Sequence, residues 1–290
     1  MADAGHFGRA AEACFITQPA LSAQVRQLEA LLEVRLFERE SRPIVTTRAG
    51  EEIVARARRV LVAIDELVEA ARSAGAPLAG TLRMGVIPTV APYLLPRVLP
   101  RVRRRHPKLR LHLREDQTAK LVAELDAGRL DVLLLALEAD LGEAATLPLF
   151  RDEFVAVMPR DHPLAKRKSL RERDLEGASV LLLDDGHCLR DQALAVCGSE
   201  RTTELADLRA TSLNTLTQML VESEALTLLP EMAVPVETRG RRDLVIRPFR
   251  APRPSRTIGL AWRRTSARAE EFELLAESLR PPGARLDSGR

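Results

Sequence analysis

One stretch near the start of the chain decides the fold: Thr17-Gln-Pro-Ala-Leu-Ser-Ala-Gln-Val-Arg-Gln-Leu-Glu-Ala-Leu-Leu32. Threonine is a favoured N-cap, and a proline two residues later is tolerated in the first turn of a helix. Leu21, Val25 and Leu28 then recur at helical spacing, so the stretch predicts a helix that turns these three side chains inward. The end of another helix, at residues 6–13, is expected to precede it.

Another face of the same helix carries side chains that could read DNA. Gln18, Ser22 and Arg26 are four residues apart and therefore share one face. Short donors with one arginine suit a helix in a major groove, although an ordinary solvated face would have the same composition. The next segment favours DNA: residues 36–39 and 44–47 predict a hairpin, and the two arginines at its tip could reach phosphate. A helix, a turn, a second helix and a wing form a DNA-binding arrangement.

The following segment, residues 48–73, predicts one long helix with a dimerisation seam. Its apolar side chains recur at alternating spacings of four and three residues: Ile53, Ala57, Val60, Ile64, Leu67 and Ala71. This is the heptad pattern of a two-stranded coiled coil, whereas a helix lying on its own domain is the plainer alternative. Gly75-Ala-Pro77 is expected to end the helix and to mark a hinge.

From Gly80 onward, predicted strands and helices alternate, which indicates an α/β domain with mostly parallel strands. Strands are expected at residues 81–87, 109–114, 132–137, 154–158, 179–183, 225–229, 244–248 and 257–262. Helices are expected at residues 94–105, 117–127, 188–197, 213–221 and 267–279. Ligands in such sheets lie beyond the carboxyl ends of the strands, and Thr89, Thr118 and His187 fall near such ends.

The helix expected at residues 188–197 has a cysteine at each end. Nine residues of helical rise would place the two Cα atoms about 13 Å apart. A disulfide requires Cα atoms within about 7 Å of each other. Cys188 and Cys197 can therefore be joined only if the helix breaks, although two small buried hydrophobic residues are the plainer alternative. The third cysteine, Cys14, is expected in the core of the first unit.

The composition restricts the class of protein. At 290 residues the chain can form two or more domains, and its net charge of +3 is compatible with nucleic-acid binding but too small to argue for it. The sequence shows no signal peptide and no apolar run of membrane-spanning length, so we expect a cytoplasmic protein with no membrane partner. Thiols are normally reduced there. The cysteine spacing predicts no zinc site, and we expect neither a metal nor another cofactor.

With these segments identified, the chain resembles the LysR-type transcriptional regulators over nearly its whole length. Four segments are similar to the winged reading head of that family, residues 6–11, 17–22, 36–39 and 46–50. Four others resemble the peroxide-sensing members of the family, residues 85–96, 117–118, 186–192 and 210–213. One of these segments, residues 186–192, contains Cys188, and metabolite-sensing members do not generally carry the pair of Cys188 and Cys197.

The resemblance implies an α/β protein in three parts. Residues 1–48 would form a winged helix-turn-helix DNA-binding domain with a truncated first helix, because family members usually begin further upstream. Residues 49–75 would form the linker and dimerisation helix, and residues 79–290 a regulatory domain shaped like a periplasmic binding protein. Its subdomain I would comprise residues 79–153 and 255–290, and subdomain II residues 154–254. Family members of this kind are typically tetramers.

The resemblance also implies roles for individual residues. Cys188 corresponds to the peroxide-reacting cysteine and Cys197 to the resolving cysteine. The sensing pocket would contain Thr89, Thr118, His187, Arg190, Asp191 and Arg256. The DNA contacts would come from Thr17, Gln18, Ser22, Arg26, Arg39 and Arg42. A helix start, a protonated His187 and the charges of Arg190 and Arg256 are expected to lower the pKa of Cys188.

The chain is thus expected to be a regulator rather than an enzyme. It would sense hydrogen peroxide through a reversible disulfide and control oxidative-stress genes. Its partners would be double-stranded promoter DNA, hydrogen peroxide, further copies of itself, RNA polymerase and a thiol reductant. The main alternative is a regulator that responds to a small organic coinducer in the cleft between the subdomains. A thiol peroxidase is a third possibility, for which the winged head and the heptad helix have no use.

Overall fold

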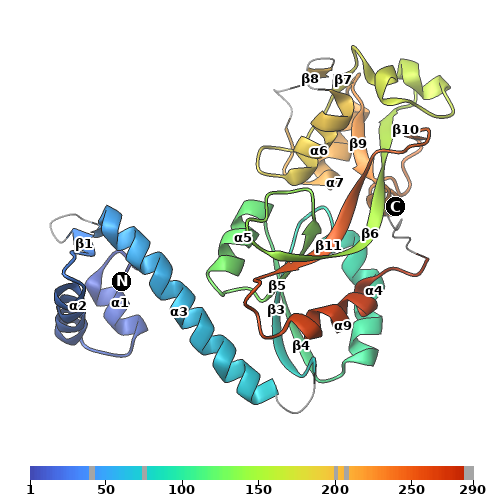
Figure 1. Cartoon of the computed structure of the whole chain (residues 1–290). Coiled ribbons are helices and arrows are strands. Elements are labelled where there is room, and N and C mark those ends of the chain that lie inside the picture. The colour runs from blue at the N-terminus through green and yellow to red at the C-terminus, as the bar shows by residue number, and fades with distance from the viewer. Residues whose placement is uncertain (39–42, 74–76, 199–201, 206–208, 284–290) are drawn as a thin grey trace. The chain divides into compact units, whose positions relative to one another are not determined.

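The computed structural model describes residues 1–38, 43–73, 77–198, 202–205 and 209–283. Its contacts divide the chain into two compact units, Met1–Val68 and Glu69–Arg290 (Figure 1). The predicted fold class is confirmed, because a helix-turn-helix with a small wing is followed by a long helix and then by an α/β domain. Within the described ranges, no helix is both long enough and apolar enough to cross a membrane.

The first unit contains the expected pair of helices and the wing. Helix α1 spans Phe7–Ala13, and α2 spans Gln18–Leu32. Strands β1, Phe37–Glu38, and β2, Val45–Thr46, pair antiparallel as the hairpin pattern predicts. The wing tip, with Arg39 and Arg42, lies outside the described residues.

Two expectations about the core of this unit are wrong. Leu28 is 44% exposed instead of buried, because the seven-residue α1 packs over Leu21 and reaches only part of Val25. Cys14 is exposed instead of buried, because it follows α1 as its C-cap and leaves the helix at that point. The cluster between α1 and α2 is therefore small, and its buried residues are Ala10, Ala11 and Leu21.

Helix α3 spans Arg48–Ser73 and begins in close contact with the chain that leads into the wing. Thr47 Oγ1 accepts a hydrogen bond from the N–H of Gly50 at 2.9 Å and donates one to the carbonyl oxygen of Arg35 at 2.7 Å. A Cβ atom on Gly50 would lie 2.1 Å from the carbonyl oxygen of Leu36. Only glycine therefore fits at position 50, where the first turn of α3 packs against the backbone of Leu36, just before β1.

A seven-stranded sheet runs through the second unit in the order β10-β6-β11-β5-β3-β4, with β9 also beside β6. The strands are β3, Gly80–Val86; β4, Leu109–Glu115; β5, Val132–Ala136; β6, Ala145–Pro159; β9, Thr227–Pro230; β10, Leu244–Pro248; and β11, Ser255–Trp262. A separate parallel pair consists of β7, Ser179–Val180, and β8, Thr203–Glu204.

The expectation of mostly parallel strands is wrong for the main sheet. Only β3 runs parallel to its neighbours, β4 and β5, and the remaining pairs are antiparallel. The reason is visible in Figure 1: β6 and β11 are long strands that run from one half of the domain into the other. Strand β6 pairs with β11 through its first part and with β9 and β10 through its second part.

Helices cover both halves of this domain. The first half contains α4, Ala91–Arg105; α5, Thr118–Asp126; and α9, Ala269–Leu279. The second half contains α6, Cys188–Cys197; α7, Leu213–Val221; α8, Val234–Glu237; and the short turns η1, Pro163–Lys166, η2, Glu172–Leu175, and η3, Glu231–Ala233. Buried apolar side chains form one cluster from residues 78–150 and 258–279, and another from residues 154–249 together with Tyr93. The exact domain boundaries given above stay predictions.

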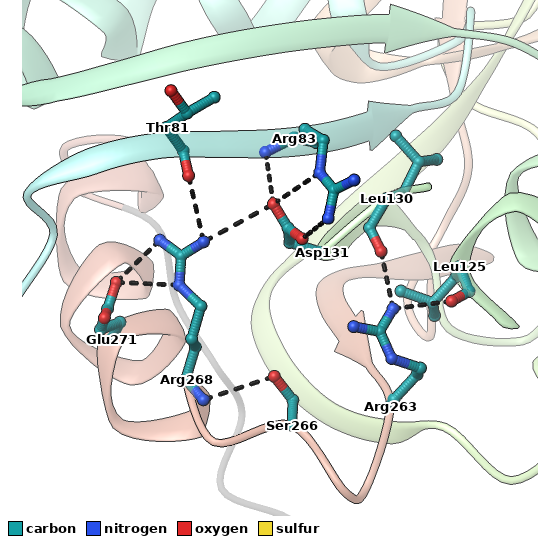
Figure 2. Close-up of polar contacts among 9 residues, drawn as sticks. All are labelled: Thr81, Arg83, Leu125, Leu130, Asp131, Arg263, Ser266, Arg268 and Glu271. Atoms are coloured by element: carbon teal, nitrogen blue, oxygen red, sulfur yellow. Dashed lines mark hydrogen bonds and ion pairs between the residues drawn. The ribbon is translucent and has the colours of Figure 1, made fainter. Parts of the chain in front are cut away.

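A largely buried ionic network around Asp131 ties the first half together, with Arg83 at its partly exposed edge (Figure 2). Asp131, just before β5, accepts hydrogen bonds from the backbone N–H of Arg83 and from its guanidinium, at 2.7 Å in each case. Arg268, just before α9, lies 3.6 Å from the same carboxylate and donates to Glu271 at 2.9 Å. The network joins β3, β5 and α9, so it is a structural element of the first half.

The contact at Gly50 gives a first prediction. The variant Gly50→Ala should lower the free energy of unfolding by about 2 kcal/mol, because the added methyl group overlaps a backbone oxygen that cannot rotate away. Urea unfolding of the full chain, followed by far-ultraviolet circular dichroism, would measure this change. Ala49→Ser, at the exposed neighbouring position, should change the stability by less than about 0.5 kcal/mol. Equal stabilities of the two variants would show that this contact is not as tight as described.

Candidate functional site

Helix α6 separates the two cysteines, as the sequence predicts. It spans Cys188–Cys197, and both cysteines are free thiols. An intact helix of this length keeps their Cα atoms about 13 Å apart. Cys188 is half-buried and packs against the first hydrophobic cluster, whereas Cys197 is 3% exposed and lies within the second. One end of α6 therefore contacts the hydrophobic cluster of the first half, and the other end belongs to the cluster of the second half.

Cys188 lines a small pocket, which we call the sulfur pocket. Its walls are Ile87, Pro88, Thr89, Gln117, Thr118, His187 and Cys188. Three of the predicted pocket residues, Thr89, Thr118 and His187, are thus brought together with Cys188. The other three, Arg190, Asp191 and Arg256, do not line this pocket. Gln117 is a lining residue that the sequence analysis placed only in a motif.

Two threonine hydroxyls with unused hydrogen-bonding capacity border the sulfur pocket. Thr89 Oγ1 accepts a hydrogen bond from Arg256 Nη1 at 2.8 Å, which leaves the hydroxyl hydrogen to donate. Thr118 Oγ1 is buried, and no described residue provides it with a hydrogen-bond partner. Since a buried hydroxyl without a partner is costly, a molecule that hydrogen-bonds to Thr118 would be stabilised there.

Arg256 supports the pocket from behind. Its side chain is fully buried, donates to Asp152 Oδ2 at 3.0 Å and donates through Nη2 to the carbonyl oxygen of Thr89 at 2.9 Å. Burial raises the pKa of Asp152, and the charge of Arg256 acts against that rise. The charge of Arg256 is thus balanced by Asp152. Sequence reasoning missed Asp152, because it stands between Arg151 and Glu153 in β6 and nothing in this charged run marks it as the buried member.

The groups beside Cys188 supply less positive charge than the sequence suggests. His187 is buried, and this burial lowers its pKa, so the imidazole is neutral at neutral pH. Arg190 is also buried, and its guanidinium is paired with Glu204 at 2.7 Å. Asp191 is exposed on the first turn of α6. Helix α6 itself begins at Cys188, so the free N–H groups of its first turn are the remaining feature that favours an anion at this position.

Cys197 has a very different environment. Burial raises its pKa to about 12, with a smaller contribution from Glu172. Because the thiolate is the nucleophilic form, Cys197 is an unreactive thiol at neutral pH while it stays buried. Any reaction at Cys197 therefore requires the surrounding structure to open.

A second pocket adjoins the sulfur pocket and shares Pro88, Thr89 and His187 with it. We call it the cleft pocket, and its polar walls include Glu115, Asn214, Tyr93 and Glu237. The Tyr93 hydroxyl donates to Glu237 Oε1 at 2.6 Å, and burial raises the pKa of this tyrosine. Among the described residues, no group of three or more His, Cys, Asp or Glu side chains is arranged to hold a metal ion.

Three of the predicted DNA-contacting residues, Gln18, Ser22 and Arg26, lie on α2. Gln18 and Arg26 are exposed on α2, and Ser22 between them is half-buried. Thr17 occupies the N-cap of α2 but makes no side-chain cap hydrogen bond, so its exposed hydroxyl is not engaged in the helix.

Comparison with known proteins identifies the class to which this fold and site belong. Residues 1–51 match the bacterial regulatory helix-turn-helix proteins of the lysR family, and residues 75–281 match the LysR substrate binding domain. The chain belongs to the LysR family of transcriptional regulators, which are DNA-binding proteins rather than enzymes.

Within this family the chain is similar to OxyR proteins. It is 44% identical to the DNA-binding transcriptional dual regulator OxyR of Escherichia coli (strain K12) over 287 residues, which cover 99% of this chain and 93% of the relative. A full-length OxyR variant from Pseudomonas aeruginosa matches with a TM-score of 0.77 and 37% identity, covering 95% of this chain and 89% of the other. A Corynebacterium glutamicum OxyR mutant with bound hydrogen peroxide matches with a TM-score of 0.67 and 39% identity, covering 96% and 89%.

Proposed function

We propose that this chain is a DNA-binding transcriptional regulator that senses hydrogen peroxide through a reversible disulfide between Cys188 and Cys197 and so controls oxidative-stress genes. The observation that carries the proposal is the arrangement around α6. One cysteine lines a pocket with two available threonine hydroxyls, and the other is buried at the far end of the same helix. The similarity to OxyR proteins, one of them bound to hydrogen peroxide, supports this function.

The first chemical step takes place in the sulfur pocket. The thiolate of Cys188 attacks one oxygen of hydrogen peroxide, so that an S–O bond forms and the O–O bond breaks. The departing hydroxide takes up a proton and leaves as water, and Cys188 becomes a sulfenic acid. The hydroxyls of Thr89 and Thr118 can hold the peroxide oxygens and stabilise the charge on the departing one.

The second step requires α6 to open. The sulfur of Cys197 attacks the sulfur of the sulfenic acid, so that an S–S bond forms, the S–O bond breaks and a second molecule of water is released. While Cys197 is buried, its raised pKa keeps it protonated and unreactive. Unwinding of α6 brings the sulfurs together and also restores the ordinary acidity of Cys197, so the conformational change and the chemistry depend on each other.

The response then passes to the DNA-binding unit through the assembly. Val60, Ile64 and Leu67 are 59%, 51% and 72% exposed along α3, which supports a dimer formed through this seam. A tetramer, contact with RNA polymerase and reset by a thiol reductant complete the proposed scheme, and the cytoplasmic location stays a prediction. Unwinding of α6 in the regulatory domains would change the spacing of the DNA contacts.

Peptide mapping tests the redox switch. After treatment with about one equivalent of hydrogen peroxide, the reduced full chain should contain a disulfide between Cys188 and Cys197, because Cys197 resolves the sulfenic acid on Cys188 once α6 opens. Mass spectrometry without reduction detects this disulfide. Cys197→Ser should stop the reaction at a sulfenic acid on Cys188, detected with a dimedone-type probe. A 188–14 disulfide within one chain, or no modification of Cys188, would contradict the proposal. If the response instead depends on an organic coinducer in the cleft pocket, Cys188→Ser will leave the regulation of a reporter gene intact.

The dimer seam has a separate test. Ile64→Glu should raise the dissociation constant of the α3-mediated dimer about tenfold or more, because a carboxylate would be buried in the seam without a partner. Analytical ultracentrifugation of the full chain over a concentration series measures this change. Ala55→Glu introduces the same charge at an exposed position of α3 outside the seam and should leave association unchanged. Equal effects of both variants would place the interface elsewhere.

A further inference from the structure

Arg190, two residues after Cys188, was expected in the sensing pocket, but its guanidinium is instead bound to three other residues of the domain. Its Nη1 and Nη2 atoms donate to the two carboxylate oxygens of Glu204 at 2.7 and 2.8 Å. Its Nε lies 2.9 Å from Asp185, and Nη1 also donates to the carbonyl oxygen of Leu183 at 3.3 Å. The side chain of Arg190 is 10% exposed, so every nitrogen of a buried guanidinium is engaged.

The partners of Arg190 come from both sides of α6 along the chain. Asp185 and Leu183 precede the helix, and Glu204 follows it on β8. One guanidinium in the first turn thus joins the segment that enters the helix to the segment that comes after it. Asp185 is 71% exposed and contributes little in water, so the fork between Arg190 and Glu204 is the main interaction.

A second arginine supports the same carboxylates. Arg209 lies 2.7 Å from Asp185 and 3.3 Å from Glu204. The pKa of Glu204 is lowered, mainly because its carboxylate accepts hydrogen bonds from Arg190. This carboxyl group is therefore charged throughout the physiological pH range. The network is therefore intact under the conditions in which the cysteines react.

Opening of α6 from its first turn disturbs this network. Cys188 can approach Cys197 only if the helix breaks, and Arg190 belongs to the turn that holds Cys188. A planar fork that donates to both oxygens of one carboxylate tolerates little displacement, in contrast to a single flexible contact. Arg190 does not line the sulfur pocket, so the reaction of Cys188 with peroxide does not involve it directly.

We propose that Arg190 and Glu204 form a latch, whose strength sets the redox potential of the Cys188–Cys197 disulfide and the rate at which the sulfenic acid is resolved. This proposal rests on the redox function proposed above and adds no reactant to its two steps. The latch stabilises the reduced, helical form. A weaker latch shifts the equilibrium toward the disulfide, which gives a more negative potential and a switch that operates at lower peroxide concentrations.

The direct test is Glu204→Gln in the full chain. The substitution keeps the shape of the side chain and removes its charge. The equilibrium constant for disulfide formation, measured in dithiol redox buffers at pH 7, should rise about tenfold, which corresponds to a potential about 30 mV more negative. Conversion of the sulfenic acid to the disulfide, followed by stopped flow, should accelerate several-fold.

The matched control is Asp131→Asn. Asp131 also pairs with arginine through a largely buried carboxylate, but it belongs to the network of the first half (Figure 2). This variant should keep the potential and the resolution rate of the unmodified chain. In a Cys197→Ser background, Glu204→Gln should leave the rate of sulfenic acid formation at Cys188 within about twofold, because the latch acts on helix opening. Arg190→Lys, which keeps the charge and loses the fork, should give an intermediate shift and serves as the second variant if Glu204→Gln does not fold.

The outcomes separate the latch from the proposed function. If the unmodified chain forms the disulfide but Glu204→Gln and Arg190→Lys keep its potential and rate, the latch is wrong and the redox function stands. Equal shifts in Asp131→Asn would show a general loss of stability and would also reject the latch. If the unmodified chain forms no 188–197 disulfide, both proposals fail together.

Discussion

An intact α6 and a disulfide between its two ends exclude each other, and the remaining features of the site depend on this constraint. The helix holds Cys188 against the first hydrophobic cluster and Cys197 inside the second. Leu189, Ala193 and Cys197 bury its inner face, and Arg190 fixes its first turn. A sulfur–sulfur bond can form only when these interactions are given up. A chemical event at one atom is thereby linked to a rearrangement of a ten-residue segment.

The pocket at the start of this helix is built from both halves of the domain. Thr89 and Thr118 come from the first half, and His187 and Cys188 come from the second. Arg256 on β11 holds Thr89 and is itself held by Asp152 on β6. The two strands that pass between the halves thus position a hydroxyl of the pocket that Cys188 also lines. The helix start, rather than a protonated histidine or a free arginine, supplies the field at Cys188.

Local patterns in the sequence predicted much of this structure. Helical spacing predicted α2, α6 and α7, the heptad predicted α3, and the cysteines at the two ends of a helix predicted the central constraint. Patterns along the chain could not predict contacts between distant residues. Arg256 and Thr89 are 167 positions apart, and Arg190 reaches Glu204 beyond the end of its own helix. The sequence also led us to expect mostly parallel strands, whereas β6 and β11 run antiparallel. The direction of these strands depends on the path of the chain between the two halves, which local patterns do not contain.

Hydrogen–deuterium exchange of the full chain, before and after peroxide treatment, tests the central claim most directly. In the reduced protein, the amides of residues 191–197 should be protected, because they are hydrogen-bonded within the intact helix α6. In protein with a confirmed 188–197 disulfide, these amides should exchange faster by about tenfold or more, while those of α9 keep their protection. Unchanged protection of residues 191–197 in the oxidised protein would contradict the account, because the disulfide would then have formed without opening the helix.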